Sequence, residues 1–523
     1  MLVTIGRLKA AAAALACTLM VGTAGLASAK PAGEAATVAI DLEHPGPTID
    51  PAVYGQFSEH LGNGIYPGIW VGPDSPIPNT NGYRNDVVAA LKHLHVPVLR
   101  WPGGCFADQY DWRDGIGPRA KRPVRVNVSW GGVEENNAFG TNEFMDFAEL
   151  IGAEAYISGN MGSMEPRAMA QWVEYMTSPS HSTLAEERRA NGRDKPWHLK
   201  YLGFGNETWG CGGNMTAETS AMTHRRFQSF VSAASQNGPM VRVASGASGD
   251  DYAFTDTMMR LAADQMDAIS LHYYTLRGDW EKKGGALGFD DAGWAKQIEQ
   301  ARRMDAILTG HSKVMDKYDP KKRVGLFVDE WGNWFDSDPK ENLGVLYQQN
   351  SLLDAVTAAT TLNIFHRHSD RVRLGAIAQM INVLQAMILT DGSKMVLTPT
   401  YHVFDMYQPF MGATPYPVTI QSPTFQAGGT TLPMVDATAA RGKDGKLWLA
   451  LVNADPERAA QVRLGAKGSV KGRVLTGDRI DAHNTFDHPN TVAPQPFAQA
   501  AGKDGLVVSL PAKSVVVVEV DQR

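Results

Sequence analysis

The chain has 523 residues, of which 43% are hydrophobic and 20% charged, and its formal net charge is −6. That length exceeds one ordinary core and predicts two or three domains, while the composition is that of a soluble globular protein. Because no long basic run is present, we expect no nucleic-acid partner.

The first 29 residues have the pattern of a secretory signal peptide. Two basic residues precede an apolar stretch over 10–26, which ends in the small-x-small sequence Ala-Ser-Ala at 27–29. Cleavage after Ala29 would leave a secreted or periplasmic protein with no membrane segment, since no later apolar run is long enough to span a bilayer. A lipoprotein site at Cys17 is less favoured, because the apolar run continues past it.

Between residues 50 and 396, short apolar runs alternate with segments of helical periodicity. This alternation is typical of a parallel sheet, and eight repeats over some 340 residues predict a catalytic (β/α)8 TIM barrel with insertions. The predicted strands are 53–57, 96–101, 155–159, 201–205, 241–245, 268–273, 324–328 and 374–379, and the predicted helices are 87–93, 143–151, 168–176, 220–235, 254–265, 295–307 and 348–366.

From residue 397 the helical periodicity disappears, and short alternating runs are separated by turn residues such as Gly-Lys-Asp-Gly at 442–445. This pattern predicts a C-terminal antiparallel β-sandwich over 397–523. The N-terminal segment 30–49 contains an alternating stretch at 36–42, which we expect to add a strand to the sandwich. The fold class is therefore α/β, a barrel followed by a sandwich.

Polar side chains stand at the tips of the predicted barrel strands, where barrel enzymes build their sites. Glu207 follows the fourth strand and Glu330 the seventh, so two carboxylates from different strands would face one cavity. Such a pair predicts acid/base or nucleophilic work on a glycosidic bond, although either residue alone could be a salt-bridge partner or a helix cap. Other tips carry Glu59, Arg100, Asn160, Asn206, His272, Tyr274 and Gln379.

Seven ordered motifs resemble the α-L-arabinofuranosidases of glycoside hydrolase family 51, which are retaining glycosidases of clan A. They are YGQFSEHLG (54–62), LRWPGG (99–104), DGIGPR (114–119), GNETWGCGGNM (205–215), ISLHYY (269–274), DEWGNW (329–334) and TPTYHVFDMY (398–407). The resemblance covers about 50–410. It implies an enzyme that releases non-reducing terminal α-L-arabinofuranosyl residues from arabinoxylan, arabinan or their oligosaccharides, with no cofactor and no metal. It also makes a homo-oligomer plausible.

The resemblance also implies a role for each matched residue. Glu207 would be the acid/base and Glu330 the nucleophile of a double displacement through a covalent glycosyl-enzyme, while Asn206 would bind the sugar 2-hydroxyl. The other implied substrate-binding residues are Glu59, Arg100, Cys105, His272, Tyr274 and Gln379, with Trp130 and Trp334 on the aglycone side.

Cys105 departs from a common form of this pattern, because many relatives carry a sugar-binding Asn after the same Gly-Gly. A thiol is a weak hydrogen-bond partner, so one sugar contact is in doubt. Cys211 follows Glu207 by four residues, in a loop above the same barrel mouth. The two cysteines could be a disulfide, which secretion would permit, or two free thiols.

Two other functions stay open: an endo-acting β-glucanase or xylanase on the same scaffold, which an open cleft would favour, and a non-catalytic carbohydrate-binding protein. The chain has no phosphate-binding Gly-rich loop, no HExxH and no GxSxG motif, so no cofactor is implied. The histidine pairs His93/His95 and His366/His368 have no third ligand nearby, and we expect surface or helix-end histidines rather than metal sites.

Overall fold

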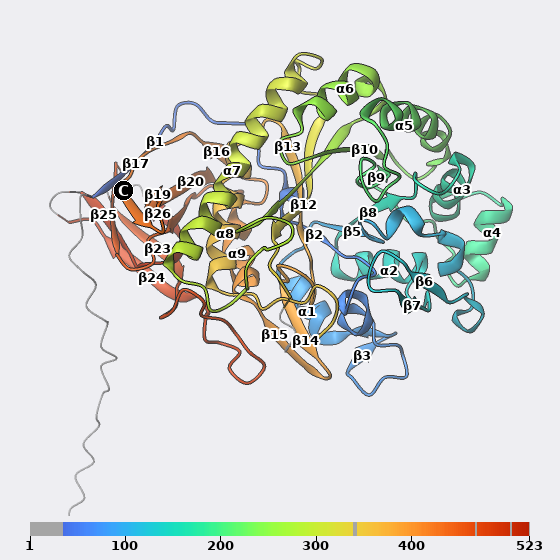
Figure 1. Ribbon diagram of the computed structural model, residues 1–523, viewed down its shortest axis with the longest axis horizontal. Helices are drawn as coiled ribbons and strands as arrows, with labels where there is room; N and C mark the ends of the chain where they lie inside the picture. The colour runs from blue at the N-terminus through green and yellow to red at the C-terminus, as the bar shows by residue number, and fades with distance from the viewer. Residues whose placement is uncertain (1–34, 338–342, 466–467, 503–504, 522–523) are drawn as a thin grey trace, which may run out of the picture.

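A computed structural model describes residues 35–337, 343–465, 468–502 and 505–521 (Figure 1). The predicted leader, residues 1–29, lies outside the described residues. No helix in the described ranges combines the length and the apolar character that a membrane crossing requires.

Eight parallel strands close into a barrel in the order in which they occur along the chain. The last strand pairs with the first, with Ala376 opposite Gly55 and Ala378 opposite Phe57. The prediction of a (β/α)8 barrel is therefore confirmed. The strands are β2 Gly55–Phe57, β5 Val98–Trp101, β8 Glu154–Gly159, β9 Tyr201–Phe204, β10 Val241–Ser248, β11 Ala268–Thr275, β12 Gly325–Asn333 and β13 Val372–Ala378.

Helices cover the outside of the barrel, and α7, α8 and α9 lie between it and the C-terminal sheets (Figure 1). In α8 every residue from Leu352 to His366 is buried, because one side packs on the barrel and the other on the sandwich. The helices are α1 Asn85–His93, α2 Thr141–Ile151, α3 Pro166–Thr177, α4 Thr183–Ala190, α5 Ala217–Val231, α6 Tyr252–Ala262, α7 Asp291–Asp316, α8 Leu352–Arg367 and α9 Pro399–Tyr407.

The C-terminal sandwich has a six-stranded sheet, β16-β20-β21-β26-β23-β24, and a four-stranded sheet, β17-β1-β22-β25. The N-terminal strand β1 pairs antiparallel with β17 and parallel with β22, so this sheet is mixed rather than purely antiparallel. The strands are β1 Ala36–Ile40, β16 Thr414–Tyr416, β17 Val418–Gln421, β20 Val435–Arg441, β21 Leu447–Asn453, β22 Ala460–Leu464, β23 Ser469–Leu475, β24 Gln495–Ala500, β25 Leu506–Leu510 and β26 Ser514–Asp521.

Four two-stranded ribbons lie outside these sheets. They are β3 Asn79–Thr80 with β4 Tyr83–Arg84, β6 Arg125–Asn127 with β7 Val133–Glu135, β14 Ile388–Asp391 with β15 Lys394–Leu397, and β18 Thr424–Ala427 with β19 Thr430–Pro433.

Helices α4 and α9 were not predicted, for opposite reasons. Half of the residues of α4 are charged, and its sequence shows little apolar periodicity. In α9 every residue except Asp405 is buried, so no polar face alternates with an apolar one. Thr398 nevertheless caps α9 by accepting from the Tyr401 backbone N–H, and Pro399 occupies the first turn, a combination typical of a helix start. The segment expected to begin the sandwich therefore begins with a helix.

The indole N–H of Trp294 on α7 ties the barrel to the sandwich by donating to the Ala454 carbonyl, at 2.8 Å. Trp294 is fully buried, so Trp294→Phe would leave that carbonyl without its partner and remove side-chain volume. We expect the free energy of unfolding to fall by about 2–4 kcal/mol in urea titrations. The matched change Trp280→Phe, at a side chain that is 58% exposed, should alter it by less than about 0.5 kcal/mol. Equal effects of the two substitutions would contradict this account.

Candidate active site

The C-terminal ends of the barrel strands surround a cavity of about 510 Å³, a size typical of small-molecule sites. Arg100 and His272 are buried and do not line the cavity, and Cys211 is bonded to Cys105, which does line it. The other predicted site residues all line the cavity: Glu59, Cys105, Trp130, Asn206, Glu207, Tyr274, Glu330, Trp334 and Gln379.

Both oxygens of Glu330, at the end of β12, are held by hydrogen-bond donors. Oε1 accepts from Arg100 Nη1 at 2.8 Å, and Oε2 accepts from the Tyr274 hydroxyl at 2.8 Å. Burial, together with the Glu330 charge, raises the pKa of Tyr274 well above its usual value, so its hydroxyl stays a donor. The two hydrogen bonds hold this carboxylate in a fixed orientation beside a cation.

Arg100 links Glu330 to the neighbouring strand ends. Its Nη2 donates to Asn206 Oδ1 at 2.6 Å, and its Nε donates to Ser158 Oγ at 3.0 Å. Burial alone would lower the pKa of Arg100, but the charges of Asp329 and Glu330 raise it above the ordinary value. The guanidinium is therefore a permanent cation beneath the cavity.

Glu207 lies in the loop after β9, with a left-handed backbone φ of 44°. Its Oε1 is 2.9 Å from His272 Nδ1, and His272 Nε2 is 3.2 Å from Asp329 Oδ1. Burial lowers the pKa of His272, but the Glu330 charge and the hydrogen bonds to Asp329 and Glu207 outweigh it and raise the pKa to about 10. His272 is therefore an imidazolium at neutral pH, hydrogen-bonded to Glu207 through Nδ1 and within ion-pair distance of Asp329 through Nε2.

The two carboxylates are close enough for a retaining mechanism. One oxygen of Glu207, one oxygen of Glu330 and one ring nitrogen of His272 all lie within 4.8 Å of one another. Retaining glycosidases hold the carboxyl groups about 5–5.5 Å apart, whereas inverting enzymes leave about 6.5–9.5 Å for a water.

Glu59 and Gln379 form the opposite wall. Glu59 Oε1 accepts from the Gly104 and Phe106 backbone N–H groups at 2.9 and 3.1 Å and from Trp130 Nε1 at 2.8 Å. Gln379 Nε2 donates to Glu59 Oε2 at 3.1 Å. Burial, and then the Glu330 charge, raises the pKa of Glu59 to about 7. Trp130, predicted as an aglycone platform, thus also orients a carboxylate.

Two residues that the predicted set did not include, Asp108 and Asp329, support the site. Asp108 accepts three backbone hydrogen bonds at 2.7 Å, from Met161, Gly162 and Asn206, and so fixes the loops after β8 and β9. Asp329 accepts from the Tyr156 hydroxyl at 2.7 Å and faces Arg100, which contributes to a lowered pKa despite burial. The sequence signal for Asp329 was its place directly before Glu330, whereas Asp108 had none beyond its loop.

The cavity rim is aromatic. The Trp334 ring contacts the Tyr274 ring edge-on with centroids 4.9 Å apart, and the Trp280 ring contacts Trp334 at 5.2 Å. Trp280 was not predicted as a site residue. It lies in the loop between β11 and α7.

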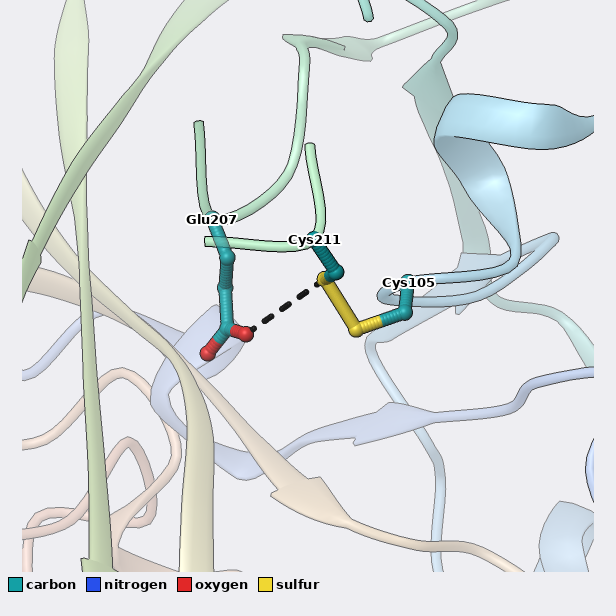
Figure 2. Close-up of side chains that lie close together, drawn as sticks. All are labelled: Cys105, Glu207 and Cys211. Atoms are coloured by element: carbon teal, nitrogen blue, oxygen red, sulfur yellow. Dashed lines mark hydrogen bonds between the residues drawn. A yellow bond between two sulfur atoms is a disulfide. The ribbon is translucent and has the colours of Figure 1, made fainter. Parts of the chain in front are cut away.

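Cys105 and Cys211 form a disulfide with a Cα–Cα distance of 5.5 Å, so the structure contains the first of the two alternatives (Figure 2). Cys211 Sγ lies 3.7 Å from Glu207 Oε2. A disulfide sulfur carries no proton, so this is a contact between acceptors unless Glu207 supplies the proton.

The two histidine pairs do not gather around a shared site. His93 faces Asp405 and His368 faces Asp305, while His366 is buried against the Tyr54 hydroxyl at 2.7 Å. Among the described residues, neither pair belongs to a group of three ligand-type side chains. His366 lies in the last turn of α8, near the helix end as expected, but it is buried rather than at the surface.

Comparisons with known proteins match this site to one family. Residues 90–286 match the model described as Alpha-L-arabinofuranosidase 1 domain, and residues 329–514 match Alpha-L-arabinofuranosidase C-terminal domain. An "Intracellular exo-alpha-L-arabinofuranosidase" of Bacteroides ovatus is 46% identical, over 96% of this chain and 99% of its own. The chain belongs to glycoside hydrolase family 51. It is a retaining α-L-arabinofuranosidase, so the resemblance noted in the sequence is confirmed. The alternative of a non-catalytic carbohydrate-binding protein is not supported.

Solved structures of this family agree. The GH51 arabinofuranosidase of Xanthomonas axonopodis pv. citri superposes with a TM-score of 0.89 at 51% identity, covering 92% of this chain and 99% of that one. The α-L-arabinofuranosidase of Thermotoga maritima, solved as an arabinose complex, gives 0.80 at 30% identity, with 93% and 99% covered.

The comparison corrects the predicted location. The Bacteroides ovatus relative is named intracellular, which points away from the secreted or periplasmic protein that we predicted. The match with this relative covers 96% of the chain and leaves 4% uncovered. A 29-residue leader would make up about 6% of the 523 residues, so the matched region extends into the predicted leader. The prediction rested on the pattern of the first 29 residues alone, and an apolar run with a small-x-small end does not by itself establish export.

Gly104→Ala tests the closeness of the backbone to the Glu330 carboxylate. A Cβ at Gly104 would lie 2.8 Å from Glu330 Oε1, which cannot move without lengthening its bond to Arg100. Because such a displacement moves a carboxylate oxygen of the active-site cavity, we expect kcat/KM to fall about 10²-fold with an aryl α-L-arabinofuranoside. Gly465→Ala is the control, since its Cβ would meet no heavy atom within 4 Å. Wild-type kcat/KM in Gly104→Ala would refute the argument.

Glu59→Gln tests the raised pKa of Glu59. The native carboxyl keeps its proton up to about pH 7, whereas the unfolded chain loses it near the ordinary value of 4.5. Wild-type stability therefore loses about 3 kcal/mol from this group as the pH rises between those values, and glutamine cannot titrate. We expect the free energy of unfolding of the variant, minus that of wild type, to rise by about this amount from pH 4.5 to pH 8 in urea titrations. A pH-independent difference would contradict it.

Proposed function

We propose that Glu330 attacks the anomeric carbon of a terminal α-L-arabinofuranosyl residue while Glu207 protonates the glycosidic oxygen. The observation that carries this assignment is the different set of partners around two neighbouring carboxylates. Glu330 accepts from a permanent cation and a hydroxyl, which suits an ionised nucleophile. Glu207 lies nearer the rim, where an acid must meet the leaving oxygen.

The contacts of Glu207 assign its proton to one oxygen. His272 donates to Oε1, which leaves Oε2 as the oxygen that carries the proton in the first step. Formation of the glycosyl-enzyme converts the Glu330 carboxylate into a neutral ester. The negative charge beside Glu207 then disappears, which favours the ionised Glu207 that must take a proton from the attacking water.

Sugar contacts are proposed for three polar residues on the cavity wall. Arg100 donates to Asn206 Oδ1, so the Asn206 amide N–H remains to bind the 2-hydroxyl. Among the described residues, buried Gln379 Oε1 has no partner and can accept from another hydroxyl, beside Glu59 Oε2. Trp130 and Trp334 are proposed for the aglycone side.

The substrate is proposed to be an arabinofuranosyl oligosaccharide derived from arabinoxylan or arabinan. The Bacteroides ovatus relative is named an intracellular exo-enzyme, and a cytoplasmic pocket would meet oligosaccharides rather than polymers. Likeness to a glucanase-xylanase at 14% identity and TM-score 0.61 concerns the fold alone and does not favour the endo-acting alternative.

We further propose that the barrel, 50–396, contains the catalytic site and that the sandwich, 397–523, stabilises the barrel. We also propose that the chain forms a homo-oligomer, which sedimentation would test. The burial of α8 between the barrel and the sandwich supports the structural role of the second unit.

A panel of 4-nitrophenyl glycosides tests the assignment. Wild type should cleave the α-L-arabinofuranoside, and Glu207→Ala should lower kcat by about 10²–10⁴-fold because deglycosylation loses its base. Azide should rescue this variant and give an arabinofuranosyl azide of retained configuration, since azide attacks the glycosyl-enzyme from the opposite face.

In Glu330→Ala, any azide product should instead be inverted, because azide then replaces the nucleophile itself. An inverted product from Glu207→Ala, or cleavage of another glycoside but not the arabinofuranoside, would disprove the assigned roles.

A further inference from the structure

The disulfide places two sulfur atoms beside the oxygen that carries the catalytic proton. Cys105 Sγ, Cys211 Sγ and a Glu207 carboxylate oxygen all lie within 4.8 Å of one another, with Cys211 Sγ 3.7 Å from Glu207 Oε2 (Figure 2). While the sulfurs are bonded to each other, neither is a thiolate, the form that binds metals.

Reduction changes this chemistry. Cys211 is exposed, so a dithiol reductant can attack the bridge. The Cys105–Cys211 bond breaks, the two sulfurs of the reductant become bonded to each other, and two electrons and two protons pass to the cysteines as thiols. Reducing compartments maintain this dithiol form.

We propose that reduction of Cys105–Cys211 creates a binding site for a thiophilic divalent cation such as Zn²⁺. Both thiolates and the Glu207 carboxylate hold the cation, and its binding prevents Glu207 from acting as the acid/base. Cation binding releases the two thiol protons to solvent. The inhibition rests on the role proposed for Glu207, whereas the site itself rests on the three ligand atoms.

The spacing suits a tetrahedral ion. Zn–S bonds of about 2.3 Å and Zn–O bonds of about 2.0–2.2 Å place ligand atoms roughly 3.3–3.8 Å apart. Cys211 Sγ and Glu207 Oε2 already have this separation, at 3.7 Å. Only the sulfurs must separate, by rotation of side chains whose Cα atoms are 5.5 Å apart. Cys105 and Glu207 line the cavity, so water can supply the fourth ligand.

The neighbouring acidic cluster does not offer an alternative cation site. Glu207, His272 and Glu330 also lie within 4.8 Å of one another. His272, however, already donates from Nδ1 to Glu207 and pairs through Nε2 with Asp329. The Glu330 oxygens accept hydrogen bonds from Arg100 and Tyr274. A cation there would face two fixed positive groups. The sulfurs are therefore required, and thiolates select Zn²⁺ over Mg²⁺ or Ca²⁺.

Zinc binding is measured first, without reference to activity. The protein is reduced with dithiothreitol under argon, freed of reductant by gel filtration and dialysed against ZnCl₂, beside an unreduced sample. We expect one zinc per reduced chain and none in the unreduced chain at the same free zinc concentration. Far-UV circular dichroism verifies that reduction leaves the fold intact. Equal zinc in both samples, or none in either, would overturn the proposal.

The activity of the same samples gives the second readout. Zinc should inhibit the reduced enzyme at least tenfold at one equivalent, with recovery in EDTA, and should leave the unreduced enzyme unaffected. Mg²⁺ should inhibit neither. Stoichiometric zinc binding without inhibition would remove Glu207 from the ligand set and defeat the proposal, while failure of the glycoside panel with intact zinc binding would defeat only the enzymatic role of Glu207.

Two variants separate the ligands from the redox chemistry. Cys211→Ser should bind zinc at least 100-fold more weakly than the reduced wild type. Any inhibition of this variant by zinc is measured against its own activity without zinc. Cys211→His cannot form the bridge but restores a ligand, so it should bind zinc without any reduction. This second variant also provides the test if the reduced wild type unfolds. Zinc binding that is unchanged in Cys211→Ser, or absent in Cys211→His, would refute the site.

Discussion

One buried guanidinium organises the catalytic end of the barrel. Arg100, on β5, donates to Glu330 from β12, to Asn206 after β9 and to Ser158 on β8. Each N–H group has a fixed direction, and a buried charge is tolerated only when its donors are satisfied. The proposed nucleophile, Glu330, and the proposed sugar-binding amide of Asn206 are therefore positioned by the same planar group, so neither can shift alone.

The remaining charges arrange themselves around that cation. Asp329, which faces both Arg100 and His272, has a lowered pKa, whereas Glu59, farther from compensating charge and close to Glu330, has a pKa raised to about 7. Equally buried carboxyls thus differ because of their neighbours rather than their depth. The asymmetry allows an ionised carboxyl, Asp329, and a protonated one, Glu59, to lie at the same end of the barrel at a pH below about 7.

The sequence predicted the barrel and the lining of its cavity because parallel strands deliver their C-terminal residues to one rim. Reading the strand tips was enough to name Glu59, Glu207, Glu330 and Gln379. It could not identify Asp108, because this residue acts by accepting hydrogen bonds from backbone amides of two loops distant in sequence. It also missed helix α9, because burial on nearly all sides removes the amphipathic signal. The export prediction failed because leader-like composition is a property of one segment alone.

Glu207 carries a further consequence in its backbone. A left-handed φ of 44° at a residue with a side chain costs on the order of 1–2 kcal/mol, and a tight turn maintains it, in which the Gly210 and Gly212 N–H groups donate to the Glu207 carbonyl. Glycine or asparagine would adopt this conformation more comfortably and would abolish proton transfer. Selection for stability therefore favours glycine or asparagine at position 207, whereas selection for activity favours glutamate. Glu207, the proposed acid/base, is retained only where the activity is selected for.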